Sequence, residues 1–160
     1  PYHVDSLMRV PLIWRPAPSA GVAPADIEAP VGHVSLAATF SHIAGLDRPA
    51  YTEAERLPTS HEESSDLGHE RVLTEWDSVL FGKIVRMRTI CRDGWIATAC
   101  LPGTVHDGSE GELYDLASDP LQEVNLWDDP SRASLRSELL ADMWDNLPVA
   151  GAQRAVDAPV

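Results

Sequence analysis

The sequence predicts an α+β fold, in which a small antiparallel sheet of about four strands carries a closing helix. Four strand-like runs follow one another along the chain, at residues 72–76, 83–90, 94–101 and 111–116. The dipeptide Asp93-Gly94 separates the second run from the third, and Asp-Gly favours the two-residue turn of a β-hairpin. After the fourth run, apolar residues recur at helical spacing. An antiparallel sheet with one helix laid on it belongs to the α+β class.

The closing helix is predicted to begin near Pro130. Asp129 can cap this helix, and proline fits the first helical position because its missing N–H would be unpaired there. One apolar face follows, formed by Leu135, Leu139, Leu140, Met143, Trp144 and Leu147. Pro148 is expected to end the helix. The sequence therefore predicts a sheet-and-helix subdomain over residues 71–148, followed by a frayed tail at 149–160.

The N-terminal part has a different character. The run RVPLIW at residues 9–14 lacks alternation, which is typical of a strand buried on both faces, so we expect it at the edge of a larger sheet. One stripe of an amphipathic helix follows, formed by Leu36, Phe40 and Ile43. Gly45 fits the C-cap of that helix. We assign residues 1–46 to this strand and helix, and residues 47–70 to an exposed loop.

The composition excludes several classes of partner. The formal net charge is −13, whereas nucleic-acid binding requires clustered Lys and Arg. The same charge disfavours an anionic membrane surface. No apolar run approaches the roughly 18 residues of a membrane helix, and no charged-then-apolar leader opens the chain. We therefore expect no nucleic acid and no membrane as partner, and a cytoplasmic location. A homo-oligomer stays open.

The chain carries no motif sufficient for catalysis. A G-x-S-x-G elbow and a G-x-x-x-x-G-K phosphate loop are both missing from the sequence. The histidine pairs His61/His69 and His33/His42 lack the i, i+4 spacing of a zinc helix, so we expect no metal site. Cys91 and Cys100 could bridge neighbouring strands, but the chain has two cysteines where a disulfide scaffold has more. We interpret both as free thiols on strands.

Several stretches together resemble one family. In chain order they are PYHVDSLMRVPLIWRP, PVGHVSLAATFSHIAGL, LTEWD, MRTICRDGWIATA and GELYDLASDPLQEVNL. They resemble the C-terminal third of the type I sulfatases, members of the alkaline phosphatase superfamily, over residues 1 to about 145. The most specific match is E-L-Y-D-L-x-x-D-P-x-E-x-x-N-L, from Glu112 to Leu126, with Gln122 and Glu123 at the acidic slot. We interpret the turn at Asp119-Pro120 within it as structural.

The resemblance implies a fold and a function. In that family the tail packs against a large α/β domain, which holds calcium and a formylglycine made from the cysteine of C-x-P-x-R. Neither Cys91 nor Cys100 stands in such a motif. The resemblance therefore implies that this chain binds no cofactor. It also implies that its partners are the N-terminal catalytic part, in the same or a companion chain, and a sulfate ester.

Within this chain, the resemblance points to the N-terminal end as the substrate side. His3 is the first candidate for a substrate contact, and Asp5 is the second. A family lysine that contacts the sulfate is expected just upstream of residue 1. Ser35 stands where the family usually has an acidic residue, which puts one local hydrogen bond in doubt.

Two alternatives stay open at this point. A phosphonate or phosphate monoester hydrolase of the same superfamily would show the same tail, because the nucleophile motif decides between them. A non-catalytic binding or scaffold module derived from the tail would also fit the sequence. In each case the isolated 160-residue chain is not expected to be active.

Overall fold

The computed structural model describes residues 3–52, 54–60, 62–67 and 70–147. The described residues divide into two compact units, one formed by residues 3–10 and 73–147 and the other by those between 11 and 72. The first unit holds the sheet and the closing helix, which confirms the predicted α+β class. Pro148 and the tail at 149–160 lie outside the described residues.

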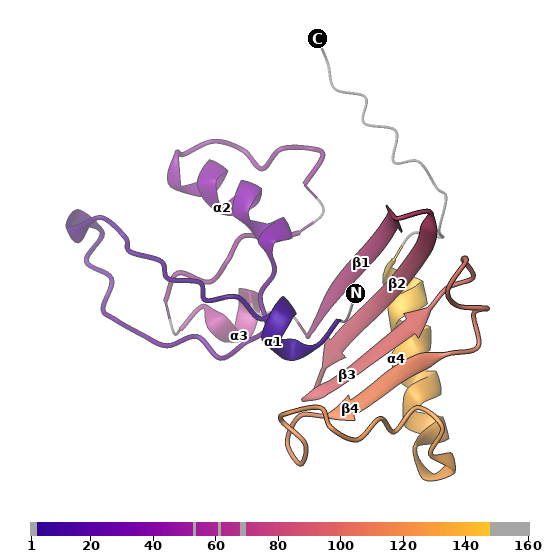
Figure 1. Ribbon diagram of the computed structural model, residues 1–160. Coiled ribbons are helices and arrows are strands. Elements are labelled where there is room, and N and C mark those ends of the chain that lie inside the picture. The colour runs from indigo at the N-terminus through magenta and orange to yellow at the C-terminus, as the bar shows by residue number, and fades with distance from the viewer. Residues whose placement is uncertain (1–2, 53, 61, 68–69, 148–160) are drawn as a thin grey trace. The chain divides into compact units, whose positions relative to one another are not determined.

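The sheet has four strands in sequence order (Figure 1). They are β1 (Arg71–Leu80), β2 (Lys83–Arg92), β3 (Trp95–Cys100) and β4 (Gly111–Asp115). Each of the four predicted runs lies on one of these strands. At the predicted hairpin turn, Asp93 and Gly94 have φ values of 52° and 78°, as a type I′ turn requires.

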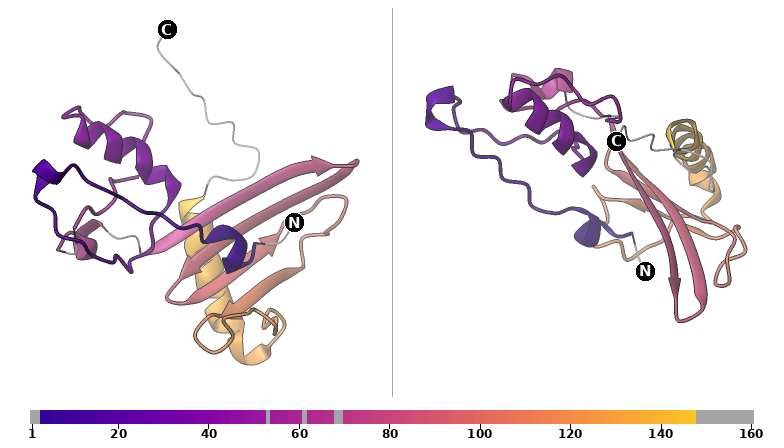
Figure 2. Two further views of the ribbon diagram at one scale, coloured as in Figure 1. Left: turned by 60° about the vertical axis from the view of Figure 1, so that its left-hand side comes forward. Right: turned by 90° about the horizontal axis from the view of Figure 1, so that it is seen from above.

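One face of the sheet is covered by helix α4 (Ala133–Asn146), as both views of Figure 2 show. The 3₁₀ turn η3 (Pro130–Arg132) leads into it, and Asp129 caps that turn by accepting a hydrogen bond from the Ser131 N–H at 2.8 Å. Between sheet and helix lies the core, formed by Ile90, Ala97, Ala99, Leu113, Trp127, Leu139 and Met143. The predicted start of the closing helix is therefore confirmed.

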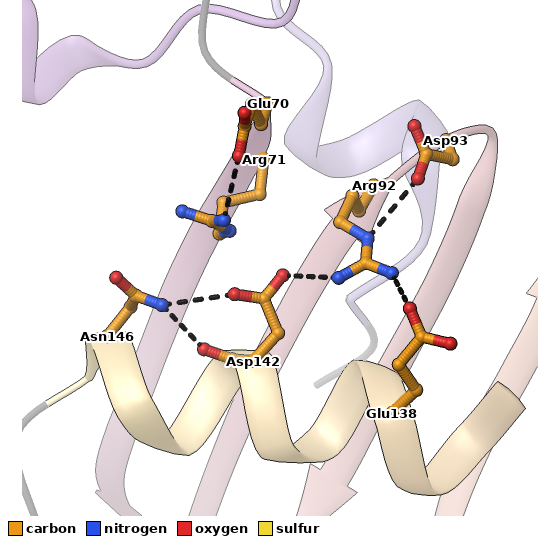
Figure 3. A network of polar contacts seen from close by, with 7 residues as sticks. All are labelled: Glu70, Arg71, Arg92, Asp93, Glu138, Asp142 and Asn146. Carbon is orange, nitrogen blue, oxygen red and sulfur yellow. Dashed lines mark hydrogen bonds and ion pairs between the residues drawn. The ribbon is translucent and has the colours of Figure 1, made fainter. Parts of the chain in front are cut away.

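A charged contact also joins the end of β2 to α4 (Figure 3). The Arg92 guanidinium donates to the Asp142 carboxylate at 2.7 Å and also pairs with Glu138, one turn earlier on the helix. Asp93 adds a third carboxylate at 3.3 Å. Because these two helix residues are spaced i, i+4, one guanidinium can engage both and fix the helix along the strand.

The connection from β4 to α4 is organised by Asn125. The Asn125 side-chain oxygen accepts hydrogen bonds from the N–H groups of Leu113 and Trp127, both at 3.0 Å. Its amide nitrogen donates to the Gly111 carbonyl oxygen at 3.0 Å. The Leu126 N–H donates to the Leu113 carbonyl oxygen at 2.8 Å. The connector therefore runs alongside β4 like a partial fifth strand and delivers Trp127 to the core.

The strand predicted at residues 9–14 does not form. These residues are irregular, and Ile13 is 90% exposed. A strand is stable only when neighbouring strands satisfy its backbone N–H and C=O groups. Among the described residues every strand belongs to the sheet β1–β4, and none pairs with this run. The run is apolar, but an apolar composition does not provide the neighbouring strand with which it would have to pair.

The second unit contains the predicted N-terminal helix, now α2 (Leu36–Ile43), with Gly45 at a φ of 69° after its end. Its other elements are short, namely η1 (Pro18–Ala20), η2 (His33–Ser35) and α3 (Ser64–Leu67). The expected stripe is not the buried one, since Phe40 is exposed and Ala38 and Thr39 are buried. Thr39 decides this face, because its hydroxyl accepts a hydrogen bond from the Leu57 N–H at 2.8 Å.

Within residues 47–70, one carboxylate organises the chain. Glu63 pairs with the Arg56 guanidinium at 2.6 Å and accepts hydrogen bonds from the Thr59 N–H and hydroxyl, both at 2.9 Å. The hydrogen bonds from Arg56 and Thr59 lower the pKa of Glu63 from 4.5 to about 2. This segment is therefore held by a charge that persists into strong acid.

The first prediction concerns Asn125; the sequence contains one other asparagine, Asn146. Replacing Asn125 with Ala removes three hydrogen bonds to the backbone and should lower the free energy of unfolding by about 2 kcal/mol. Urea unfolding measures the change. Asn146→Ala is the matched control, because this side chain bonds only to Asp142, one helical turn away, and it should cost less than about 0.5 kcal/mol. Equal losses in the two variants would contradict the role of Asn125.

The second prediction concerns pH. The unfolded Glu63 carboxyl takes up a proton below about 4.5, whereas the folded one resists protonation until about 2. Stability from this contact is therefore fully present above pH 4.5 and is lost as the pH falls towards 2. Hydrogen exchange at the Thr59 amide should show this loss, and Glu63→Gln should abolish the dependence.

Glu55→Gln serves as the control for that experiment. Glu55 forms an exposed pair with Arg48 at 2.8 Å, and such pairs contribute little. If Glu55→Gln changed the Thr59 exchange as much as Glu63→Gln, the local assignment would be wrong.

Candidate functional site

The face of the sheet opposite α4 carries a row of polar side chains. Side chains alternate between the two faces of a strand, and residues paired across strands share a face. Thr89 pairs with Thr98, and Thr98 pairs with Glu112 on its other side. Ile90 and Ala97, one residue along in each strand, point into the core beneath α4. The row Thr89–Thr98–Glu112 therefore crosses the three strands β2, β3 and β4 on the opposite face.

His3 joins this row. Its Nδ1 lies 2.6 Å from the Thr89 hydroxyl, which lies 2.8 Å from the Thr98 hydroxyl. The His3 side chain is only 4% exposed. The Trp76 ring on β1 meets the imidazole edge-on, with 6.2 Å between ring centroids. A residue 86 positions away in sequence from Thr89 is thus seated directly on the sheet.

Burial determines the charge of the imidazole. It lowers the pKa of His3 below 6.5, and the nearby positive charge of Arg88 lowers it further. The ring is therefore neutral at physiological pH, with one nitrogen carrying a proton. Within the described part of the chain, its Nε2 has no hydrogen-bond partner. The Nε2 atom is itself buried, so a group from outside these residues can reach it only where the His3 ring is uncovered.

Glu112 forms the other end of the row. Burial raises the pKa of its carboxyl group, and the charge of His106 opposes that shift. One of its oxygens, Oε2, is buried and unpartnered among the residues that the structure describes. The protonated form is therefore favoured more than in water. The two ends of the row are both pushed towards their neutral forms.

Asp5 begins the short helix α1 (Asp5–Met8). The Asp5 N–H donates to the Gln122 side-chain oxygen at 2.6 Å, across 117 positions in sequence. Gln122 lies in the connector after β4 and has a left-handed φ of 55°. Both predicted substrate-side residues, His3 and Asp5, therefore lie on the segment that the polar face of the sheet holds.

The two cysteines are confirmed as free thiols. Both occupy the same face as the row, since Cys91 pairs with Ile96 and Cys100 with Met87. Burial raises the pKa of each thiol, with Asp5 adding to the effect at Cys91 and Glu112 at Cys100. Only the thiolate is nucleophilic, so neither cysteine is activated.

The described residues supply no cluster of side chains that could hold a metal ion. Within those ranges, no group of three or more His, Cys, Asp or Glu side chains could hold a metal ion. His61 and His69 lie outside them. The Thr89 hydroxyl does meet an imidazole, but the side chain is 1% exposed, which leaves no path for an ester. None of the helices in the described part is long and apolar enough to span a bilayer.

Sequence reasoning missed Thr89, Thr98 and Gln122. The first two could have been found, because the Asp93-Gly94 turn fixes the hairpin register and both threonines are equally far from it. For Gln122, the sequence placed it in the acidic slot of a motif interpreted as structural. No sequence signal connects it to Asp5.

Among known proteins, only solved three-dimensional structures proved similar to this chain. No family model matches the chain. No curated protein matches it either. Solved structures do match, and each covers about two thirds of this chain.

A 2-O GAG sulfatase is 29% identical, covers 67% of this chain and has a TM-score of 0.56. A protein of Bacteroides thetaiotaomicron VPI-5482 assigned as a sulfatase is 25% identical over 67% of this chain, with a TM-score of 0.53. A third structure holds its substrate, D-glucosamine-2-N,6-O-disulfate; it is 18% identical over 69% of this chain, with a TM-score of 0.54, and shows the fold alone.

In all three cases this chain spans only 22% of the matched protein. The match lies in the C-terminal part of the sulfatases. Over two thirds of its length, this chain is similar in structure to the C-terminal part of sulfatases.

Proposed function

We propose that this chain is the C-terminal portion of a sulfatase-like hydrolase, whose complete form hydrolyses sulfuric esters. The observation that carries the proposal is the structural similarity to sulfatases at 25% and 29% identity. The motif from Glu112 to Leu126 supports it, because Asn125 joins the connector to β4 and the Asp119 carboxylate accepts hydrogen bonds from the N–H groups of Glu123 and Val124. The partner is then the N-terminal catalytic part, in the same or a companion chain.

Calcium and formylglycine do not fit the residues of this chain. Cys91 is half-buried and Cys100 buried, neither stands in a C-x-P-x-R motif, and the described carboxylates form no metal cluster. We therefore assign both groups to the catalytic part, and no step of the reaction to them here. The role left for this chain is to shape the substrate side of the site.

His3 is the residue that we assign to the substrate. With a net charge of −13, the chain as a whole repels a sulfate ester. A neutral imidazole offers a hydrogen bond without adding a negative charge, and its burial keeps it neutral. Asp5 is assigned the second position, near a hydroxyl or amine of the substrate, where a carboxylate can accept. Sulfated amino sugars are the first substrates to test, since one of the similar structures holds one.

The third prediction tests this activity. The native protein, with its companion chain if it has one, should release sulfate from 4-nitrophenyl sulfate and from sulfated glucosamine. The 160-residue chain alone should release none, because the nucleophile lies elsewhere. Ion chromatography of the released anion measures both. Release of phosphate from the matching phosphate ester, with no release of sulfate, would overturn the proposal.

The fourth prediction concerns His3 within that protein. His3→Gln should lower kcat/KM for sulfate release by about tenfold or more, the cost of one directed hydrogen bond in the transition state. His42→Gln is the control, because His42 is an exposed residue of α2 and should leave kcat/KM unchanged. An unchanged kcat/KM in His3→Gln would remove His3 from the substrate side.

A further inference from the structure

Two hydrogen bonds between residues far apart in sequence hold the N-terminal segment, residues 3–8, on the sheet. One joins the His3 ring to Thr89, and the other joins the Asp5 N–H to Gln122. They span 86 and 117 positions of the chain, and each ends on a residue of this segment that we assign to the substrate side. Their partners, on β2 and in the β4–α4 connector, have no assigned part in function.

We propose that Thr89, Thr98 and Gln122 are positioning residues of the sulfatase-like site. They act through the N-terminal segment: the two threonines set the place and ring orientation of His3, and Gln122 sets the start of α1 at Asp5. This inference rests on the proposed function for its catalytic consequence. Its structural part stands on the contacts alone.

Thr89 and Thr98 hold the His3 ring in a fixed position. Thr98 lies in β3, which is paired on one side with β2 and on the other with β4, so its backbone is fixed by two ladders. Both threonine side chains are almost completely buried. Their hydroxyl groups lie 2.8 Å apart, in buried surroundings where a hydrogen bond is stronger than in water. A ring bonded to this pair at 2.6 Å is therefore held more firmly than a ring bonded to a loop.

The second anchor depends on how the connector is shaped. Gln122 adopts a left-handed conformation, which is uncommon for glutamine. The Asp119 carboxylate accepts hydrogen bonds from the N–H groups of Glu123 and Val124 at 3.0 and 2.9 Å, and the Asp119 carbonyl oxygen accepts one from the Gln122 N–H at 3.1 Å. These bonds hold the turn that aims the Gln122 amide at α1.

The Gln122 contact also caps the N-terminal end of α1. Asp5 is the first residue of α1, and the first N–H groups of a helix have no partner within it. The residue before it, Val4, offers no side-chain cap. The Gln122 oxygen, at 2.6 Å, takes that place. The acidic slot of the motif is therefore filled here by a neutral amide that caps a helix from the far end of the chain.

The test compares two substitutions at one residue in the native, full protein. Thr89→Val keeps the shape and removes the hydroxyl, whereas Thr89→Ser keeps the hydroxyl. Thr104→Val is the control, since the hydroxyl of this exposed threonine accepts a hydrogen bond from the Ile84 N–H at 2.7 Å and has no hydrogen bond to residues 3–8. The readouts are kcat/KM for sulfate release as a function of pH, and the NMR titration of the His3 ring.

We expect Thr89→Val to lower kcat/KM by about tenfold, and Thr89→Ser and Thr104→Val to change it less than about twofold. Released from its buried place, the His3 ring should titrate closer to 6.5 in Thr89→Val, so that activity falls at a higher pH than in the unmodified protein. Arg88, whose charge acts on the His3 ring, is unchanged in all three variants, as are Cys91 and Glu112 on the same face of the sheet.

Gln122→Leu tests the hydrogen bond between Gln122 and Asp5, and it replaces the first test if Thr89→Val does not fold. It removes the acceptor of the partly buried Asp5 N–H and should raise KM more than it lowers kcat, because binding geometry is lost before chemistry. An unchanged KM and an unchanged His3 titration in the two variants would overturn the proposal.

Failure of the positioning role is distinguishable from failure of the proposed function. If the unmodified protein releases no sulfate, the sulfatase assignment fails. The His3 titration then still reports whether Thr89 holds the ring. If the unmodified protein releases sulfate but Thr89→Val matches Thr104→Val in rate and titration, the positioning role fails alone.

Discussion

The carboxamide of Asn125 is the contact on which the rest of the first unit depends. Its three hydrogen bonds to backbone groups lay the connector along β4 and so bring Trp127 under α4. The Trp127 ring packs so closely on Gly111 that residue 111 has no room for a side chain. A Cβ at Gly111 would lie 2.4 Å from the Trp127 ring, well inside van der Waals contact. The same connector, a few residues earlier, carries Gln122, whose side chain bonds to the Asp5 N–H.

The two faces of the sheet have different chemistry and separate tasks. Beneath α4 the core is apolar, with Arg92 joining the helix to β2 at the edge. On the other face a hydroxyl pair, a raised-pKa carboxyl group and a neutral imidazole form a polar row beside an apolar cluster of Val85, Met87 and Cys100. An apolar core supplies stability, and polar groups fixed on rigid strands supply directed hydrogen bonds. This arrangement is compatible with the proposed role of a portion that shapes a site.

Local pattern predicted the elements well. The Asp93-Gly94 turn, the four strands and the start of the closing helix are each set by residues adjacent in sequence. Residues 9–14 form no strand in this structure, because strand pairing depends on neighbouring strands that composition does not reveal. Similarly, the buried side of α2 was decided by Thr39 bonding to the distant Leu57. The candidate site depends on contacts across 86 and 117 positions, so the resemblance pointed to His3 and Asp5, but no pattern in the sequence connected them with Thr89 and Gln122.

The central claim is that these 160 residues are one portion of a larger hydrolase. The most direct test is the intact mass and terminal sequence of the polypeptide in its native source, together with any chain that copurifies with it. The account predicts a polypeptide or complex several times this length, with a C-x-P-x-R segment upstream of Pro1 or in the companion chain. A native polypeptide that begins at Pro1 and has no companion would contradict the account and leave a binding or structural module.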